Sequence, residues 1–152
     1  MTKVNVVIVK GPTTEDTAKV GAVVITPGFL LELETDGEVI PHAAIGGNQF
    51  RMFAKNRDFL GKEISEIIPV GDTLQVINAQ PGAVINAILE DVQTIVIGDL
   101  LESAGDGTLR KHVPIASTGA NSFTVLPLSI VGTATEAVTT AGATARIAVR
   151  IV

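Results

Sequence analysis

Short apolar runs, each closed by a turn signal, divide this chain along its whole length. There are about nine such runs at spacings near ten residues, a rhythm typical of all-β proteins. Valine, isoleucine and threonine supply about a third of the 152 residues, and β-branched side chains pack well on a pleated sheet. The sequence therefore predicts an all-β fold, mainly an antiparallel β-barrel or sandwich.

Two turn sequences predict hairpins. The pair Asp36-Gly37 stands between the runs 29–35 and 38–44, and an Asp-Gly pair in this setting is a strong hairpin signal. A Gly-Asp-Gly turn at 105–107 separates two further apolar runs in the same way. We therefore expect each turn to join two antiparallel neighbours.

Two features mark the carboxy-terminal half. In the last run Ile147, Val149 and Ile151 alternate with other residues, so their side chains should share one face of a strand. The tripeptide Val70-Gly71-Asp72 also recurs in similar form as Ile97-Gly98-Asp99. Two occurrences are too few for a solenoid, and we interpret them as tight turns that lead into two strands of one barrel.

Three stretches are less strand-like. Residues 1–28 could form an extended amino-terminal arm, and residues 41–57 an extended loop or arm. Residues 58–67 come closest to a helical pattern, although a glycine interrupts them, and we predict one short helix there. With these additions the sequence predicts a single β domain over 1–152.

Composition excludes several classes of protein. The chain has no cysteine, and hence no disulfide framework, thiolate metal site or cysteine nucleophile. A formal net charge of −5 without tryptophan or tyrosine argues against nucleic acid as a partner, because such binders need basic fields and stacking rings. The uncharged run 113–135 could reach across a bilayer, but its prolines, glycines and polar residues would leave backbone groups unpaired in hydrocarbon. We therefore expect no membrane partner.

The search for reactive groups finds no catalytic residues. His42 and His112 lie 70 residues apart and have no metal-spaced partner nearby. No serine lies in a Gly-x-Ser-x-Gly elbow, the sequence that typically carries a hydrolase nucleophile. Asp99, Glu102 and Asp106 could approach one another and hold Ca²⁺, although a solvated acidic loop is the simpler interpretation. The sequence thus predicts neither an enzyme nor a cofactor or metal.

Charge is distributed in blocks. Residues 51–62 hold four basic residues and one acid, whereas residues 63–109 hold eight acids and no base. Three of the five phenylalanines lie in or beside the basic block. It could be a solvated face whose rings fill the protein's own core, or a subunit contact in which apolar anchors and charges meet an acidic patch of a neighbouring copy. The interface candidates in this segment are Phe50, Arg51, Phe53, Lys55, Arg57 and Phe59.

Several motifs in residues 50–152 resemble those of one viral family. They are Val70-Gly-Asp-Thr-Leu-Gln-Val-Ile, the Gly-Asp-Leu-Leu-Glu-Ser segment at 98–103 followed by Gly-Asp-Gly-Thr-Leu-Arg at 105–110, and the ending Arg-Ile-Ala-Val-Arg at 146–150. Together they resemble the head decoration proteins of tailed bacteriophages, also called cement or auxiliary capsid proteins. The resemblance implies a small β-rich fold, here expected to be β-tulip-like, without an active site.

The resemblance also implies a role. Proteins of this family bind the outer face of an assembled capsid, commonly as homotrimers at local three-fold positions, and clamp the shell against the pressure of the DNA. The partners expected for this chain are therefore further copies of itself and the major capsid protein. Its expected location is the outside of the virion, after synthesis in the host cytoplasm.

The amino-terminal strand is a further candidate for an interface. Val4, Val6 and Ile8 alternate within the run Val4 to Val9. Such a strand could add to the sheet edge of a neighbouring copy through backbone hydrogen bonds, or it could be an edge strand of its own barrel.

Two other classes of function stay open. The chain could be a ligand-binding or adhesive β module of a surface fibre, although such sugar-binding modules usually present tryptophan or tyrosine. It could also be a small β-barrel enzyme, which would require a pocket where several acids converge.

Overall fold

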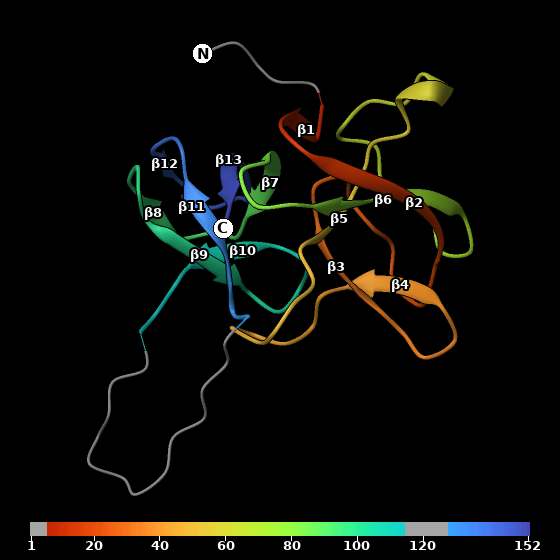
Figure 1. Cartoon of the computed structure of the whole chain (residues 1–152), viewed down its shortest axis with the longest axis horizontal. Coiled ribbons are helices and arrows are strands. Elements are labelled where there is room, and N and C mark those ends of the chain that lie inside the picture. The colour runs from red at the N-terminus through yellow and green to blue at the C-terminus, as the bar shows by residue number, and fades with distance from the viewer. Residues whose placement is uncertain (1–5, 115–127) are drawn as a thin grey trace, which may run out of the picture.

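The computed structural model describes residues 6–114 and 128–152, which form an all-β fold as predicted. Figure 1 shows two small barrels side by side. The first is a closed ring of five strands: β2 (Thr13–Val20), β3 (Leu30–Leu33), β4 (Glu38–Pro41), β5 (Met52–Ala54) and β6 (Thr73–Ala79). The second ring comprises β7 (Val84–Leu89), β9 (Leu100–Ser103), β10 (Leu109–Lys111), β11 (Ile130–Ala134) and β13 (Ala145–Ile151).

Three short strands lie outside these rings. Strand β1 (Ile8–Lys10) pairs with β7 of the same chain, and β8 (Thr94–Ile95) pairs with β12 (Val138–Thr139). Residues 58–67 contain a single 3-10 turn, η1 (Asp58–Leu60), which ends at Gly61 with a φ of 67°. The predicted helix is therefore reduced to one turn, because this glycine takes the left-handed conformation that stops a helix. No helix among the described residues is long and apolar enough to cross a membrane.

The two barrels have the same connectivity. In each ring the first strand pairs with the third in parallel and with the fifth antiparallel. The second strand pairs antiparallel with the third and fourth, and the fourth pairs antiparallel with the fifth. The chain is therefore a tandem repeat of one five-stranded barrel, where the sequence had indicated one barrel.

The repeat is visible in the sequence once the structure defines its period. Gly28 corresponds to Gly98 and the Asp-Gly turn at 36–37 to that at 106–107, a spacing of 70 residues. The glycines of the two turns, Gly37 and Gly107, have φ angles of 87° and 84°, a conformation that a β-carbon disfavours. The repeat of Val70-Gly-Asp as Ile97-Gly-Asp is a different matter: one precedes β6 and the other β9, the fifth and second strands of their barrels. Both are tight turns that lead into a strand, as predicted, but the two strands belong to different barrels and not to one.

Both predicted hairpins are confirmed, as β3–β4 and β9–β10. The predicted amino-terminal arm contains a barrel strand, whereas most of the predicted loop at 41–57 is a loop, residues 42–51, that leads into a barrel strand. Within residues 1–28, β2 pairs with β6 along seven positions, and within residues 41–57, β5 lies between β3 and β6. These segments looked irregular because β2 is polar and exposed and β5 is only three residues long. That residues 1–152 fold as one domain stays a prediction.

Two apolar clusters form the core. One fills the first barrel and includes Leu31 and Ala54, and the other fills the second barrel. The second cluster also takes in Leu30, Phe53 and Ile77 from the first barrel, which lie in one row across β3, β5 and β6. Because alternate residues of a strand face opposite ways, this row covers the face of the first barrel that packs against the second.

Arg146 ties the two barrels together with hydrogen bonds. Its Nη2 donates to the backbone carbonyls of Pro27 at 2.8 Å and Ile64 at 2.7 Å, and its Nη1 donates to that of Asn86 at 3.4 Å. Burial lowers the pKa of the Arg146 guanidinium. A β-carbon on Gly28 would lie 2.7 Å from Nη1, so that glycine leaves room for the guanidinium.

Replacement of Arg146 by methionine should lower the free energy of unfolding by about 2–4 kcal/mol, because hydrogen bonds from a charged donor are lost and buried carbonyls are left without partners. Arg150→Met provides the control, since Arg150 is exposed on the same strand. Urea denaturation followed by circular dichroism measures both variants. Equal stability of the two would contradict the role assigned to Arg146.

Candidate functional site

The loop of residues 42–51, called here the junction loop, leaves β4 of the first barrel and crosses onto the second. The buried His42 ring holds its start: Nδ1 lies 2.8 Å from the Ser103 hydroxyl and Nε2 lies 2.9 Å from the Asn48 carbonyl. A carbonyl only accepts, so Nε2 donates to the Asn48 carbonyl. Ser103 is 0% exposed. This histidine–serine pair is a structural link that no substrate can reach.

Replacement of Ser103 by alanine should lower the free energy of unfolding by about 1–3 kcal/mol, the usual effect of leaving a buried polar group without its partner. The affected groups are His42 Nδ1 and the Gly105 N–H, which donates to the serine oxygen at 3.2 Å. Ser65→Ala, at an exposed position, is the control. An unchanged denaturation midpoint for Ser103→Ala would show that the link does not fasten the loop.

The three acids considered for Ca²⁺ do not converge. The buried Glu102 carboxylate accepts from Arg110 Nε and Nη2 at 2.9 and 2.7 Å, and its other oxygen lies 2.6 Å from His112 Nδ1. Asp99 instead pairs with Lys111 at 2.8 Å, and this hydrogen bond lowers the pKa of the Asp99 carboxyl. Asp106 accepts from the backbone of its own turn. The hypothesis of a calcium site at these residues is therefore wrong for the described structure.

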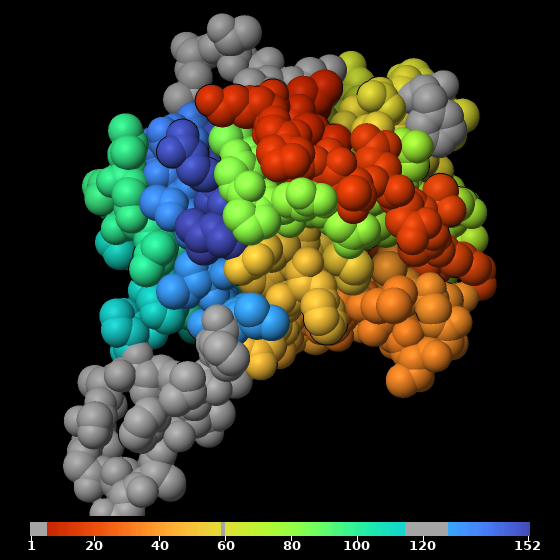
Figure 2. Space-filling view, in the orientation of Figure 1, coloured from red at the N-terminus to blue at the C-terminus, as the bar shows by residue number. Residues whose placement is uncertain are grey.

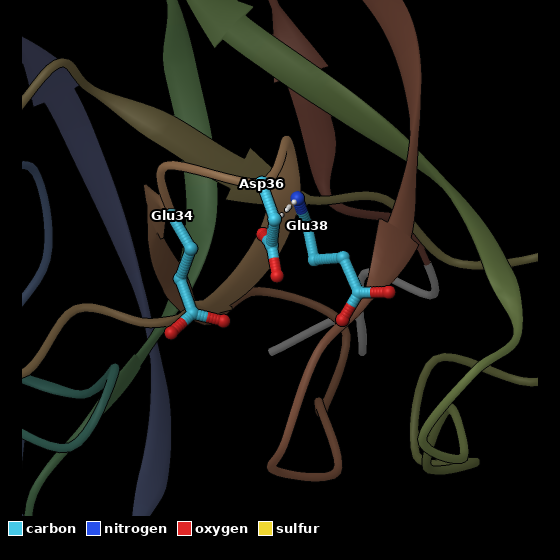
Figure 3. Close-up of side chains that lie close together, drawn as sticks. All are labelled: Glu34, Asp36 and Glu38. Carbon is cyan, nitrogen blue, oxygen red and sulfur yellow. Dashed lines mark hydrogen bonds between the residues drawn. The ribbon is translucent and has the colours of Figure 1, made fainter.

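A different acidic group lies on the β3–β4 hairpin (Figure 3). Glu34, Asp36 and Glu38 can bring one carboxylate oxygen each within 4.8 Å of one another. Asp36 accepts a hydrogen bond from the Glu38 N–H at 3.0 Å, and the Glu38 carboxylate pairs with Lys19. These contacts account for two of the three side chains as parts of an exposed turn, and we assign no metal to the group.

The second half of the junction loop is bound to the segment that enters β11. The buried Gln49 amide donates to the carbonyls of Leu128 at 3.1 Å and Ile130 at 3.3 Å, and Asn48 Oδ1 accepts from the Leu128 N–H at 3.0 Å. In Figure 2 the gold segment around residue 50 lies between the first barrel and the blue residues that follow position 128. The loop is thus fixed at both ends.

This fixed loop displays an apolar surface. The Phe50 side chain is 76% exposed, and Ile45 and Leu128 are also exposed. Burying a phenylalanine ring is one of the larger gains available to a side chain, so a ring held in solvent on an ordered loop is a notable feature. Exposed apolar groups on well-fixed surfaces typically mark interaction sites.

Arg51 follows directly and is unusual in two ways. Its φ of 56° places a non-glycine residue in the left-handed region, which costs roughly 1–2 kcal/mol. Its Nε is buried without a hydrogen-bond partner among the described residues, and its guanidinium joins none of the ion pairs found there. Strained backbone and unsatisfied polar groups concentrate at functional sites.

The other bases of the segment 51–62 are neutralised within the chain. Their ion pairs are Lys55–Glu15 at 2.9 Å, Arg57–Asp72 at 2.7 Å and Lys62–Glu66 at 2.9 Å. The basic block that the sequence presents is therefore reduced to Arg51 in the folded chain.

The remaining interface candidates differ in how far they are exposed. Phe53 is 0% exposed, which corrects its place among surface candidates: its ring fills the contact between the barrels. Val6 is exposed and Ile8 is half-buried in β1, whose backbone pairs with β7 of the same chain. Val4 and the Phe59 side chain lie outside the described part of the structure.

Sequence reasoning missed the residues that connect the barrels, His42, Ser103 and Arg146. The 70-residue spacing of the two histidines was the available signal, because it equals the period of the repeat. The two histidines occupy equivalent positions, immediately after β4 and β10.

The chain matches no family model and no curated protein. Among solved structures it is similar to the N base of head fiber gp8.5 of bacteriophage phi29, with a TM-score of 0.56 and 18% sequence identity. The match covers 93% of this chain and 95% of the phage chain. The two proteins therefore share their fold along nearly their full lengths.

Proposed function

We propose that this chain is a structural protein of a tailed-phage head that attaches to the outer face of the capsid shell and performs no catalysis. The observation that carries the proposal is the likeness in fold, over nearly the whole of both chains, to the base of a phage head fiber. The resemblance of residues 50–152 to head decoration proteins points to the same class from the sequence.

The surface of the chain is compatible with such a role. A protein that attaches to a shell needs a well-fixed contact surface rather than a cavity, and the junction loop provides one with Phe50 exposed near its end. Contacts with a second protein would bury the apolar side chains that the chain alone leaves in solvent.

The sequence resemblance suggests a finer role. In this version the chain forms a homotrimer at three-fold positions, contacts the major capsid protein and stabilises the shell. A second role, the base of a surface fibre, is favoured by one specific observation, since the similar solved structure is the N base of a head fiber. Both roles require attachment to the head, but only the first requires that attachment raise the thermal stability of the shell.

The test mixes the purified full chain with undecorated phage heads, separates the heads by sedimentation and measures the bound protein. The mass of the free protein is measured by light scattering. We expect saturable binding and the mass of a trimer. A monomer that stays in the supernatant at all concentrations would contradict the proposal. A rise in the temperature at which heads open distinguishes a stabilising protein from a fibre base.

A further inference from the structure

We infer that the Asp16 carboxylate blocks the addition of a further strand at one edge of β2, and that it thereby keeps copies of the chain from pairing through their first barrels. The edge in question, called here the open edge, is the side of residues 13–18 that faces away from β6. The inference does not rest on the proposed function, because it concerns the free protein and involves no phage head.

The first argument is the missing neighbour of β2. On one side β2 pairs with β6 along seven positions, whereas on the other side β4 pairs only with its last two residues. No strand of the described ranges pairs with the open edge. Residues 14–17 are all exposed, and β2 lies on the surface in Figure 2. An exposed edge of this length is a template on which another strand can pair.

The direction of the backbone groups follows from the register. The Gln75 carbonyl in β6 accepts from the Lys55 N–H, which follows β5, so the backbone groups of Gln75 point away from β2. Thr17 is the partner of Gln75 in β2. In an antiparallel ladder the backbone groups of such a residue also point away from its partner, and the Thr17 N–H therefore points to the open edge.

The second barrel shows what fits on an edge of this kind. The parallel pairs Val20–Val39 and Leu89–Leu109 close the two rings at equivalent places, so the first strands, β2 and β7, can be aligned on them. The part of β7 that β10 does not reach is covered by β1, which runs antiparallel to it. The corresponding part of β2 is the open edge.

The two barrels differ in the side chains at this place. Counting back along the aligned strands, Asp16 corresponds to Ile85 and Thr17 to Asn86. The Asn86 N–H donates to the Val7 carbonyl at 2.7 Å, and the side chains of Ile85 and Val7 are both fully buried. The Thr17 N–H donates instead to the Asp16 carboxylate, also at 2.7 Å.

This difference accounts for the open edge. The Asp16 carboxylate occupies the donor that an added strand would need, and an added strand would bury its charge, which is costly without a partner. Charged side chains are a common protection of exposed sheet edges. Without this protection the open edges of two copies could pair with each other.

The test replaces Asp16 by isoleucine, the residue at the corresponding place in β7. Light scattering over a series of concentrations measures the mass of the free protein. At high concentration Asp16→Ile should at least about double the mass relative to the wild type, because two open edges can then pair. Asp16→Thr, which keeps a polar side chain at this exposed position, should also associate. Far-ultraviolet circular dichroism checks that both variants fold, and a loss of strand signal in both would contradict the inference by showing that the barrel itself needs Asp16.

Two further variants show whether association uses the open edge. Adding Thr17→Pro to Asp16→Ile should restore the wild-type mass, because proline has no N–H to offer an added strand and β6 does not use the N–H at this position. Glu63→Ile makes a similar exchange at an exposed acid outside the strands and should leave the mass unchanged. A wild-type mass for Asp16→Ile, equal association of Glu63→Ile, or association that survives Thr17→Pro would overturn the inference.

Discussion

Replacement of Phe53 by alanine is expected to lower the free energy of unfolding by about 3–5 kcal/mol, the range measured for large aromatic residues removed from protein cores. Phe53 is fully buried and lies with Leu30 and Ile77 in the row that joins the first barrel to the core of the second. Loss of the ring leaves a cavity where both barrels depend on contact. The effect should therefore extend to the whole chain.

The control is Phe50→Ala, three residues earlier in the sequence. Because its ring is exposed, this change should alter the free energy of unfolding by less than about 0.5 kcal/mol. Guanidinium denaturation, followed by circular dichroism and by hydrogen exchange in each barrel, measures both variants. Loss of stability confined to the first barrel, or equal effects of the two substitutions, would contradict the shared core described above.

Replacement of Gly132 by valine is the second substitution with a large expected effect. Gly132 lies in β11 between β9 and β13. A β-carbon there would stand 2.3 Å from the Arg150 carbonyl oxygen and 2.7 Å from Val149 Cγ1. The backbone of a paired strand in a narrow closed barrel cannot move aside, so we expect a loss of about 3 kcal/mol or more, at the upper end for overpacked sites.

Gly37→Ala separates crowding from backbone strain. Gly37 has a φ of 87° but no atom within 4 Å of an added β-carbon, so its substitution should lower stability by only about 1–2 kcal/mol through conformational strain. Thermal denaturation of both variants makes the comparison. A Gly132→Val protein as stable as the wild type would contradict the close approach of β13 to Gly132.

The predictable part of the fold is the local part. The β3–β4 hairpin follows from Asp36-Gly37, because a glycine in the left-handed conformation closes a short turn between the two strands. The shared face of Ile147, Val149 and Ile151, which is buried, follows from their alternation along one strand. These predictions need only neighbouring residues.

The division into two barrels depends on distant pairings and was not predicted. Closure of each ring requires a parallel pair, β2 with β4 and β7 with β10, and single strand patterns contain no signal for such partners. Strand β7 is an example. Its six residues are all buried, because one face lines its own barrel and the other faces the first barrel. An apolar run of this kind fits several folds equally well.

The sequence predicted which segment holds the candidate site, but not which of its side chains are exposed. Phe50 and Phe53 were both candidates, and only the pairing of β5 decides that one ring is exposed and the other buried. Most of the basic side chains of residues 51–62 are likewise neutralised by ion pairs such as that of Lys55 with Glu15, two residues that lie 40 positions apart in the sequence. Spacing along the sequence cannot reveal such ion pairs.

We propose that this two-barrel chain attaches to the outside of a phage head through its junction loop. Cryo-electron microscopy of heads incubated with the purified chain tests it directly. We expect added density on the outer face into which the two barrels fit side by side, with the junction loop at the contact with the shell. Heads without added density, or bound chains whose junction loop points into solvent, would contradict it.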